Sequence, residues 1–182
     1  MQGEGVKIRL FIAINFNEEV IDKIFRIQSK LKRYAVKGNF TRKENFHLTL
    51  VFIGETDNLA AVKGVMDRIS ADPFTITIAG LGKFKRRGGD IYWLGIDRTK
   101  ELTDLYSQIS SELYSLGFDI EKREYKPHLT LGREVILQRN FDEKTFSEKL
   151  SPISMEVSRI SLMKSERING KLTYTEIYYK QL

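Results

Sequence analysis

The sequence predicts an α+β fold built from two similar lobes that face each other. Three observations support this prediction. Apolar segments of strand length alternate with amphipathic helical segments, and no low-complexity linker divides the chain. A strand, a helix and a strand beginning His-Leu-Thr-Leu occur twice, with the second strands starting at His47 and His128. The spacing repeats as well, because Ile12 precedes His47 and Trp93 precedes His128 by 35 residues each.

The first half of the chain is predicted to contain two strands and two helices. Residues 9–15 and 46–54 are apolar enough for buried strands. Asn17 is a suitable N-cap for the first helix, which should run to about Arg33, and Asp57 is expected to cap the second. The apolar residues that recur at helical spacing are Val20, Ile24, Ile27 and Leu31, and then Leu59, Val62, Val65 or Met66, and Ile69.

The second half is predicted to contain further strands and two more helices. Gly88-Gly89 and Asn169-Gly170 suit turns between strands, since glycine permits positive φ. A helix with one apolar face should end at Gly117. Strands are expected at residues 74–85, 91–96, from 128 to at least 132, 155–163 and 172–179, and helices at 102–116 and 142–150.

The composition fits one domain, and we expect residues 1–182 to form it with one His-x-Thr motif in each lobe. Hydrophobic residues make up 41% of the chain, which is ordinary for a globular protein. Lys and Arg number 30 against 24 Asp and Glu, a formal charge of +6. This basic excess fits either a plain soluble surface or a surface that binds a polyanion such as nucleic acid.

Several compositional features predict a cytoplasmic monomer that does not enter a membrane. No apolar run approaches the roughly 18 residues that a membrane span needs. Residues 1–7 lack the features of a secretory signal. The chain has no cysteine, which excludes a disulfide framework and a thiolate metal site.

The only two histidines of the chain both begin the tetrapeptide His-Leu-Thr-Leu, at residues 47–50 and 128–131. At background residue frequencies, a chance repeat of the three following residues has a probability of roughly one in a thousand. Alternate side chains of a strand share a face, so each histidine should lie beside Thr49 or Thr130 while the leucines enter the core. Facing lobes would then bring two imidazoles and two hydroxyls to one cleft.

Such a cleft suits phosphodiester hydrolysis without a metal or a cofactor. Imidazole can activate water as a base and protonate the departing oxygen as an acid, because its pKa of about 6.5 lies near neutrality. Threonine hydroxyls can bind phosphate oxygens. The alternatives are two structural histidines or a metal site, but two histidines without cysteine or an HExxH helix supply few ligands. Neither a GxxxxGKS/T loop nor a GxGxxG turn is present, so nucleoside triphosphate dependence is not indicated.

The paired motifs resemble those of the two-histidine phosphoesterase superfamily, and most closely those of the RNA 2′,3′-cyclic phosphodiesterases, also called 2′-5′ RNA ligases. The resemblance covers nearly the whole chain. The segments that carry it are residues 9–15, 45–54, 126–133 and 162–165, with Gly170 and Tyr174.

This resemblance implies two lobes related by a pseudo-twofold axis, with mainly antiparallel sheets lining a V-shaped central cleft. It implies hydrolysis of RNA 2′,3′-cyclic phosphate ends to 2′-phosphomonoesters, together with a reversible 2′-5′ RNA ligase activity. His128 would accept a proton from water and His47 would donate one to the 3′-oxygen, although the residues alone do not tell acid from base. Thr49 and Thr130 would hold phosphate oxygens. RNA ends, tRNA halves among them, are the expected partners.

Three further groups of residues could contact the substrate. Arg133 resembles the arginine found at this place in the family, yet its odd spacing from His128 requires a bend or bulge to turn it into the cleft; otherwise it serves a structural ion pair. Basic residues could guide the RNA backbone or be merely solvated, and aromatic residues could stack on a base or belong to the core. These residues are Lys83, Lys85, Arg86, Arg87, Arg42, Lys43 and Lys126, and Phe11, Tyr92 and Trp93.

Two other functions would use the same residues. One is a phosphodiesterase for a small cyclic nucleotide or an ADP-ribose cyclic phosphate, and the other is a module that binds nucleotides without turnover. The basic charge favours RNA over a small nucleotide. Two titrating groups disfavour the binding module, because binding alone does not require them.

Overall fold

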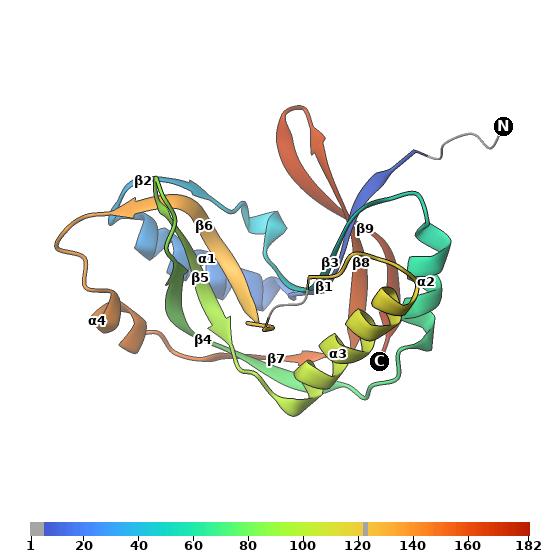
Figure 1. Ribbon diagram of the computed structural model, residues 1–182. Coiled ribbons are helices and arrows are strands. Elements are labelled where there is room, and N and C mark those ends of the chain that lie inside the picture. The colour runs from blue at the N-terminus through green and yellow to red at the C-terminus, as the bar shows by residue number, and fades with distance from the viewer. Residues whose placement is uncertain (1–5, 122–123) are drawn as a thin grey trace.

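Two antiparallel sheets form the frame of the protein in the computed structural model, which describes residues 6–121 and 124–182 (Figure 1). Their strand orders are β3-β1-β8-β9 and β2-β6-β5-β4-β7. The prediction for residues 1–7 therefore lies mostly outside the described residues. The strands are β1 (Ile8–Asn15), β2 (Ala35–Phe40), β3 (His47–Thr56), β4 (Phe74–Phe84), β5 (Asp90–Ile96), β6 (His128–Leu137), β7 (Ile153–Val157), β8 (Arg159–Ile168) and β9 (Lys171–Gln181).

Helices cover the faces of the sheets that turn away from the space between them (Figure 1). Each of the four α-helices begins at a polar residue whose side chain accepts from a backbone N–H of the first turn, as with Asn17 and the N–H of Val20 at 2.9 Å. Gly117 follows the third helix with φ +85°, a conformation that favours glycine. The helices are α1 (Glu18–Lys32), η1 (Lys43–Asn45), α2 (Leu59–Arg68), α3 (Lys100–Ser115) and α4 (Glu143–Glu148).

The two lobes share one continuous apolar core. The leucines of both motifs contribute to it, since Leu48 is 0% and Leu129 is 1% exposed. The burial pattern is the same over the first five residues of β3 and β6, with half-buried His and Thr alternating with buried Leu. The predicted α+β fold with two facing lobes is confirmed.

The helix that follows the first strand of each repeat packs on the opposite lobe. α1 leaves β1 of the first sheet and lies against the second, where the buried Gln28 amide donates to the carbonyl oxygens of Thr41 and Leu131 at 2.7 and 2.8 Å. α3 leaves β5 of the second sheet and packs beside β3 and α2 of the first. Each lobe is therefore completed by a helix from the other.

Both motif strands carry a β-bulge at the fourth residue of the motif. Leu50 is the extra residue of β3 against β1, and Leu131 is the extra residue of β6 against β5. Such an insertion reverses the face on which the following side chains lie. The Leu131 carbonyl oxygen accepts the backbone N–H of Thr41 at 2.9 Å, so the carbonyl of the extra residue has a partner. The two halves of the chain thus share a backbone bulge as well as the tetrapeptide sequence.

Three of the expected elements differ in the structure. Asn58 rather than Asp57 caps α2, because Thr56 extends β3 and its hydroxyl accepts the Asn58 N–H at 3.0 Å. The strand expected at 155–163 is two strands, since the chain passes at Ser158 from β7 in the second sheet to β8 in the first. β2 was not predicted, because this short edge strand is polar and lacks regular alternation.

None of the described helices is long and apolar enough to cross a membrane.

Loss of a buried motif leucine should destabilise the whole molecule. We expect Leu48→Ala to lower the free energy of unfolding by about 3 kcal/mol, because it leaves a cavity in the shared core. Urea denaturation followed by circular dichroism measures this change. Leu116→Ala is the matched control, since Leu116 is 50% exposed and its loss should cost less than about 0.5 kcal/mol. Equal losses in both variants would contradict the burial of the motif strand.

Candidate active site

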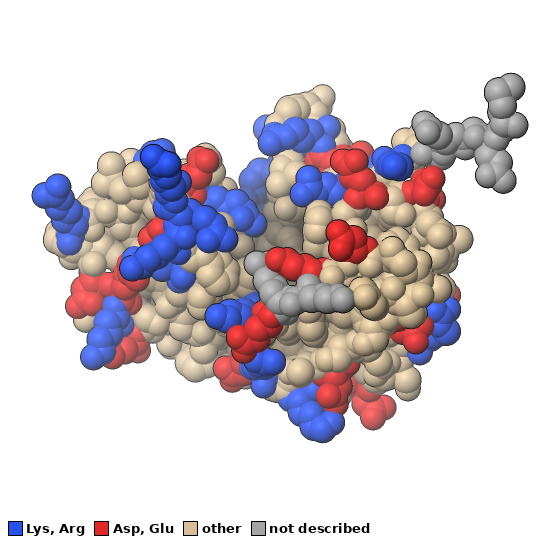
Figure 2. All heavy atoms as spheres, in the orientation of Figure 1, with Lys and Arg blue, Asp and Glu red and all other residues tan. Residues whose placement is uncertain are grey.

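The two motifs lie on strands from different sheets that approach each other without pairing. β3 is the edge of the first sheet, β6 lies inside the second, and their backbones come into contact. A hollow separates the two lobes on the face shown in Figure 2. Thr49 lies opposite Ala13, and Thr130 lies opposite Trp93, each on the face of its strand that carries the motif histidine. The structure thus brings both imidazoles and both hydroxyls to one cleft.

Backbone carbonyl groups select the same tautomer for both histidines. Nδ1 of His47 lies 2.8 Å from the carbonyl oxygen of Asn45, and Nδ1 of His128 lies 2.6 Å from that of Lys126. A carbonyl oxygen can only accept, so each Nδ1 carries a proton and donates it. The lone pair of each neutral ring is therefore on Nε2. Nε2 is thus the nitrogen of each neutral ring that can accept a proton.

His47 lies deep in its sheet between two aromatic rings. Its ring centroid is 4.9 Å from that of Phe11 and 5.1 Å from that of Tyr174, which meets it edge-on. Its Nε2 accepts a hydrogen bond from the Thr49 hydroxyl at 2.9 Å. The first motif therefore holds its own histidine and threonine together.

Burial lowers the pKa of His47 below its usual 6.5, because the charged imidazolium loses contact with water. The hydrogen bond to the Asn45 carbonyl opposes this effect, while the positive charges of Arg133 and His128 lower the pKa further. Electrostatic effects of this kind require proximity. Arg133 and His128 both lie on β6, so these charges act on His47 from the strand of the second motif.

The bulge at Leu131 resolves the orientation of Arg133. Arg133 lies five residues after His128, so an ideal strand would place the two side chains on opposite faces. The extra residue Leu131 shifts the alternation by one and places Arg133 on the face of His128. Gly132 lies opposite the buried Tyr92, so the next residue faces the cleft. The positive charge of Arg133 also acts to lower the pKa of Tyr174, which burial raises. Arg133 forms no ion pair within residues 6–121 and 124–182 and is available to an anion.

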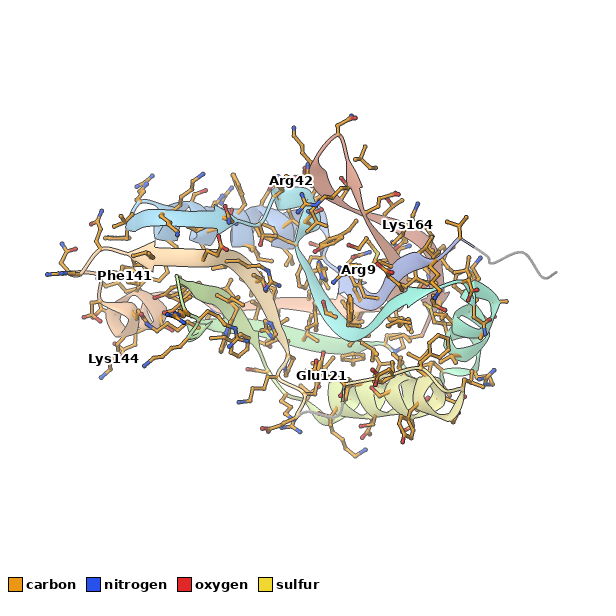
Figure 3. The ribbon with its side chains drawn as sticks, turned by 45° about the horizontal axis from the view of Figure 1, so that its top comes forward. Arg9, Arg42, Glu121, Phe141, Lys144 and Lys164 are labelled. Atoms are coloured by element: carbon orange, nitrogen blue, oxygen red, sulfur yellow. The ribbon has the colours of Figure 1, made fainter. Side chains whose placement is uncertain are left out.

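A clamp, formed by Arg42 and Asn45 on the carbonyl oxygen of Leu172, closes the first sheet over His47. The Arg42 guanidinium donates to this oxygen at 2.6 Å and the Asn45 amide at 3.0 Å. Figure 3 shows Arg42 against the β8–β9 hairpin, and Tyr174 follows two residues after Leu172. Asn45 is 7% exposed and acts twice, since its own carbonyl also holds Nδ1 of His47.

Tyr125 links the two motifs directly. It lies three residues before His128, and its hydroxyl donates to the backbone carbonyl of Thr49 at 3.2 Å. Its ring stacks on Tyr106 of α3 with centroids 4.2 Å apart, and burial raises the pKa of its hydroxyl. Tyr125 therefore keeps its proton at neutral pH and donates it in this hydrogen bond.

The aromatic residues beside the motifs divide between cleft and core. Phe11 lies against His47, whereas the Tyr92 side chain is 3% exposed and donates from its hydroxyl to Glu143 at 2.6 Å. Trp93 and Phe84 lie beside His128, with centroids at 5.8 and 5.1 Å. Trp93 lies flat across Gly82, where a Cβ atom would come within 2.1 Å of the indole. Glycine at this position lets the indole reach His128.

Among the described residues no group of three or more His, Cys, Asp or Glu side chains could hold a metal ion.

Residues 21–169 match the family model of the 2′-5′ RNA ligase superfamily, a range that contains both motifs. The chain belongs to the 2′-5′ RNA ligase superfamily. The family expected from the paired motifs is therefore confirmed.

Relatives within this superfamily match over most of their length. The RNA 2′,3′-cyclic phosphodiesterase of Thermotoga maritima is 33% identical over 180 residues, 96% of this chain and 93% of its own. That of Methanothermobacter thermautotrophicus is 34% identical over 183 residues, 94% and 97% of the two chains. The crystal structure of E. coli LigT complexed with 3′-AMP is 26% identical, covers 97% of this chain and 98% of its own, and has a TM-score of 0.81.

Four residues of this superfamily member surround the motifs although they were not among the expected site residues. Asn45 precedes the first histidine by two residues, but nothing in the pattern distinguished its carbonyl from any other. Tyr125, Tyr174 and Phe84 reach the site through sheet curvature and cross-lobe contacts that local spacing does not reveal.

The clamp should keep His47 buried. We expect Asn45→Ala to raise the pKa of His47 toward 6.5, because opening the sheet restores water to the ring. NMR titration measures this pKa directly, and His128→Gln in the same background assigns the remaining histidine signal. Arg42→Gln is the control, since it leaves the Asn45 donor in place and should shift the pKa less. An unchanged pKa in Asn45→Ala would contradict the clamp.

The lowered pKa of His47 should also make stability depend on pH. Below about pH 6.5 the unfolded chain binds a proton at this site more readily than the folded protein does, so the free energy of unfolding falls as the pH drops. We expect the Tm of His47→Gln to fall by less than that of the wild type when the pH is lowered from about 7 to about 5.5. Both proteins share every carboxylate, so the difference isolates His47. Parallel losses would contradict a lowered pKa.

Proposed function

We propose that this protein hydrolyses RNA 2′,3′-cyclic phosphate ends to 2′-phosphomonoesters, with His47 and His128 as the acid–base pair. One observation carries the proposal. Both imidazoles donate from Nδ1 to a backbone carbonyl, so Nε2 is the nitrogen of each neutral ring that can take up a proton. Hydrolysis of a phosphodiester needs one group that takes a proton from the attacking water and a second that gives a proton to the departing oxygen, and two imidazole nitrogens can fill these roles.

The reaction moves one proton at each histidine. Nε2 of His128 accepts a proton from a water molecule whose oxygen attacks the phosphorus. The bond between phosphorus and the 3′-oxygen breaks, and that oxygen takes the proton carried by Nε2 of His47. The products are a 2′-phosphomonoester and a free 3′-hydroxyl. With an RNA 5′-hydroxyl in place of water, the same steps join two strands through a 2′-5′ phosphodiester. The reverse of that ligation, in which the two histidines exchange roles, cleaves the 2′-5′ linkage and re-forms the cyclic phosphate.

Thr49, Thr130 and Arg133 are proposed to bind the phosphate group. Both hydroxyls lie on the face that carries the histidines, two residues further along each strand. The guanidinium of Arg133 can bind two phosphate oxygens at once and neutralise charge that develops on them. These contacts would hold the phosphorus between the two Nε2 atoms.

The surroundings of His47 make its protonation depend on the substrate. Burial and the charge of Arg133 lower its pKa, so the ring is neutral near pH 7 in the free protein. A bound phosphate anion offsets that positive charge and favours the imidazolium. The acid is then formed where the departing oxygen needs it. His128, in the other sheet, takes the role of base.

The relatives support this substrate class. Several curated relatives, including those of Thermotoga maritima and Methanothermobacter thermautotrophicus, are named RNA 2′,3′-cyclic phosphodiesterases, and E. coli LigT has been crystallised with 3′-AMP. RNA ends, with tRNA halves among them, are accordingly our proposed partners. We propose further that residues 1–182 act as a single domain with one motif in each lobe, as a monomer in the cytoplasm. The apolar core shared by the lobes supports the single domain.

The proposal is tested with a short RNA ending in 2′,3′-cyclic phosphate, incubated in EDTA. The wild type should release only product with a 2′-phosphate, while His47→Ala and His128→Ala should each lose at least about a hundredfold in kcat, because each removes one proton transfer. Leu116→Ala, at an exposed position, is the control. Turnover that survives both histidine substitutions would contradict the mechanism. If the protein hydrolysed a small cyclic nucleotide but not the RNA, the result would support the small-substrate alternative. If it bound nucleotides without hydrolysing them, the result would support the binding module.

A further inference from the structure

The hairpin between β4 and β5 ends in three consecutive basic residues, Lys85, Arg86 and Arg87, here called the basic tip. All three side chains are exposed. Figure 2 shows Lys and Arg gathered over this hairpin, on the wall of the hollow that the second sheet forms. The catalytic scheme uses none of them. Their function is therefore open to inference from what surrounds them.

The two carboxylates beside the basic tip, Asp90 and Glu134, bind partners other than its three side chains. Asp90 accepts the backbone N–H of Arg86 at 3.1 Å and lies 3.6 Å from Nζ of Lys83. Glu134 accepts the side-chain amide of Asn39 at 2.7 Å. Within residues 6–121 and 124–182, the three basic side chains of the tip form no ion pair. Their charges are available to an anion.

The hairpin is held in place against the strand of the second motif. Gly89 has φ +137°, and a Cβ atom there would come within 2.5 Å of the Glu134 backbone. Glu134 follows Arg133 directly, so the tip is fixed beside the arginine that faces the cleft. The Asp90 carboxylate closes the turn itself. Fixed cations lose less conformational freedom on binding than mobile ones.

The basic tip also continues the aromatic wall beside His128. Phe84 precedes Lys85, and its ring lies 5.1 Å from that of His128 and 5.3 Å from that of Trp93. From Phe84 to Arg87 the extended chain spans at most about 10 Å. Aromatic rings near the histidine followed by cations further out match a nucleic-acid strand, whose bases stack and whose phosphates repeat along the chain.

We propose that the basic tip binds the phosphate backbone of the RNA strand upstream of its cyclic end. This proposal rests on the proposed function, because it places that end between the two histidines. Arg133 would bind the reacting phosphate. The basic tip would bind the phosphates of nucleotides that lie further toward the 5′ end. The surface would give a polymer an advantage over a cyclic mononucleotide, which has no upstream phosphate. The site would thereby select RNA ends over free nucleotides.

The test compares two substrates in two variants of equal charge. The tip variant is Lys85→Gln/Arg86→Gln/Arg87→Gln. The control variant is Arg26→Gln/Lys30→Gln/Arg33→Gln, three exposed residues on the outer side of α1 in the same lobe, none of them in an ion pair among the described residues. The substrates are a single-stranded decanucleotide with a 2′,3′-cyclic phosphate end and a nucleoside 2′,3′-cyclic phosphate. The measured quantity is the ratio of their kcat/KM values over a range of salt concentrations.

We expect the tip variant to lower this ratio about tenfold at low salt. The slope of log kcat/KM for the decanucleotide against log salt concentration should lessen by about 2, because three phosphate contacts to a single strand are lost. The control variant should keep the wild-type ratio and slope. An unchanged ratio in the tip variant, or an equal fall in both variants, would overturn the proposal.

Fluorescence anisotropy of the labelled decanucleotide separates this proposal from the proposed function. Weaker binding by the tip variant than by the control supports the basic tip even if the wild type hydrolyses neither substrate. Equal binding by both variants overturns the basic tip even if hydrolysis is confirmed. Circular dichroism of both variants shows that each is folded, so neither result arises from loss of structure.

Discussion

The site depends on one backbone constraint, the extra residue that each motif strand accommodates at its fourth motif position. Without the bulge at Leu131, strict alternation along β6 would turn Arg133 away from the histidines. An inserted residue normally leaves a backbone group without a partner, yet the Leu131 carbonyl binds both the Thr41 N–H and the Gln28 amide. Gln28 belongs to the helix supplied by the other repeat. The orientation of a cleft residue is thus stabilised by a contact beneath the sheet.

The two halves of the site use the same chemistry in different surroundings. Each histidine donates from Nδ1 to the carbonyl two residues before it, so strand geometry alone sets which nitrogen meets a ligand. Around that shared arrangement the lobes diverge. The first sheet curls until Asn45 binds Leu172 and buries His47, whereas Phe84 and Trp93 line one side of His128. Different environments around identical residues are how a protein separates an acid from a base.

Local sequence predicted much of this molecule, and what it missed shares a physical cause. Periodicity and capping residues located most strands and helices, and the repeated tetrapeptide indicated the family, because both are properties of neighbouring residues. The β2 edge strand and the break at Ser158 depend on which sheet a segment joins, a choice made by distant partners. Asn45, Tyr125 and Tyr174 reach the histidines through such partners too. The bulge was recognised only as a condition for Arg133, because no residue type in the motif requires it.

The exchange of helices between the lobes bears on how such a molecule could arise. α1 and α3 each follow a strand of one sheet and complete the other, so neither lobe has a full core without its neighbour. A half-length ancestor that traded this helix with a second copy would assemble the same frame as a symmetric homodimer. Gene duplication and fusion would then place both copies in one chain and end the requirement for symmetry. Only after that step could one histidine become buried beneath a tyrosine while its twin remained beside a tryptophan.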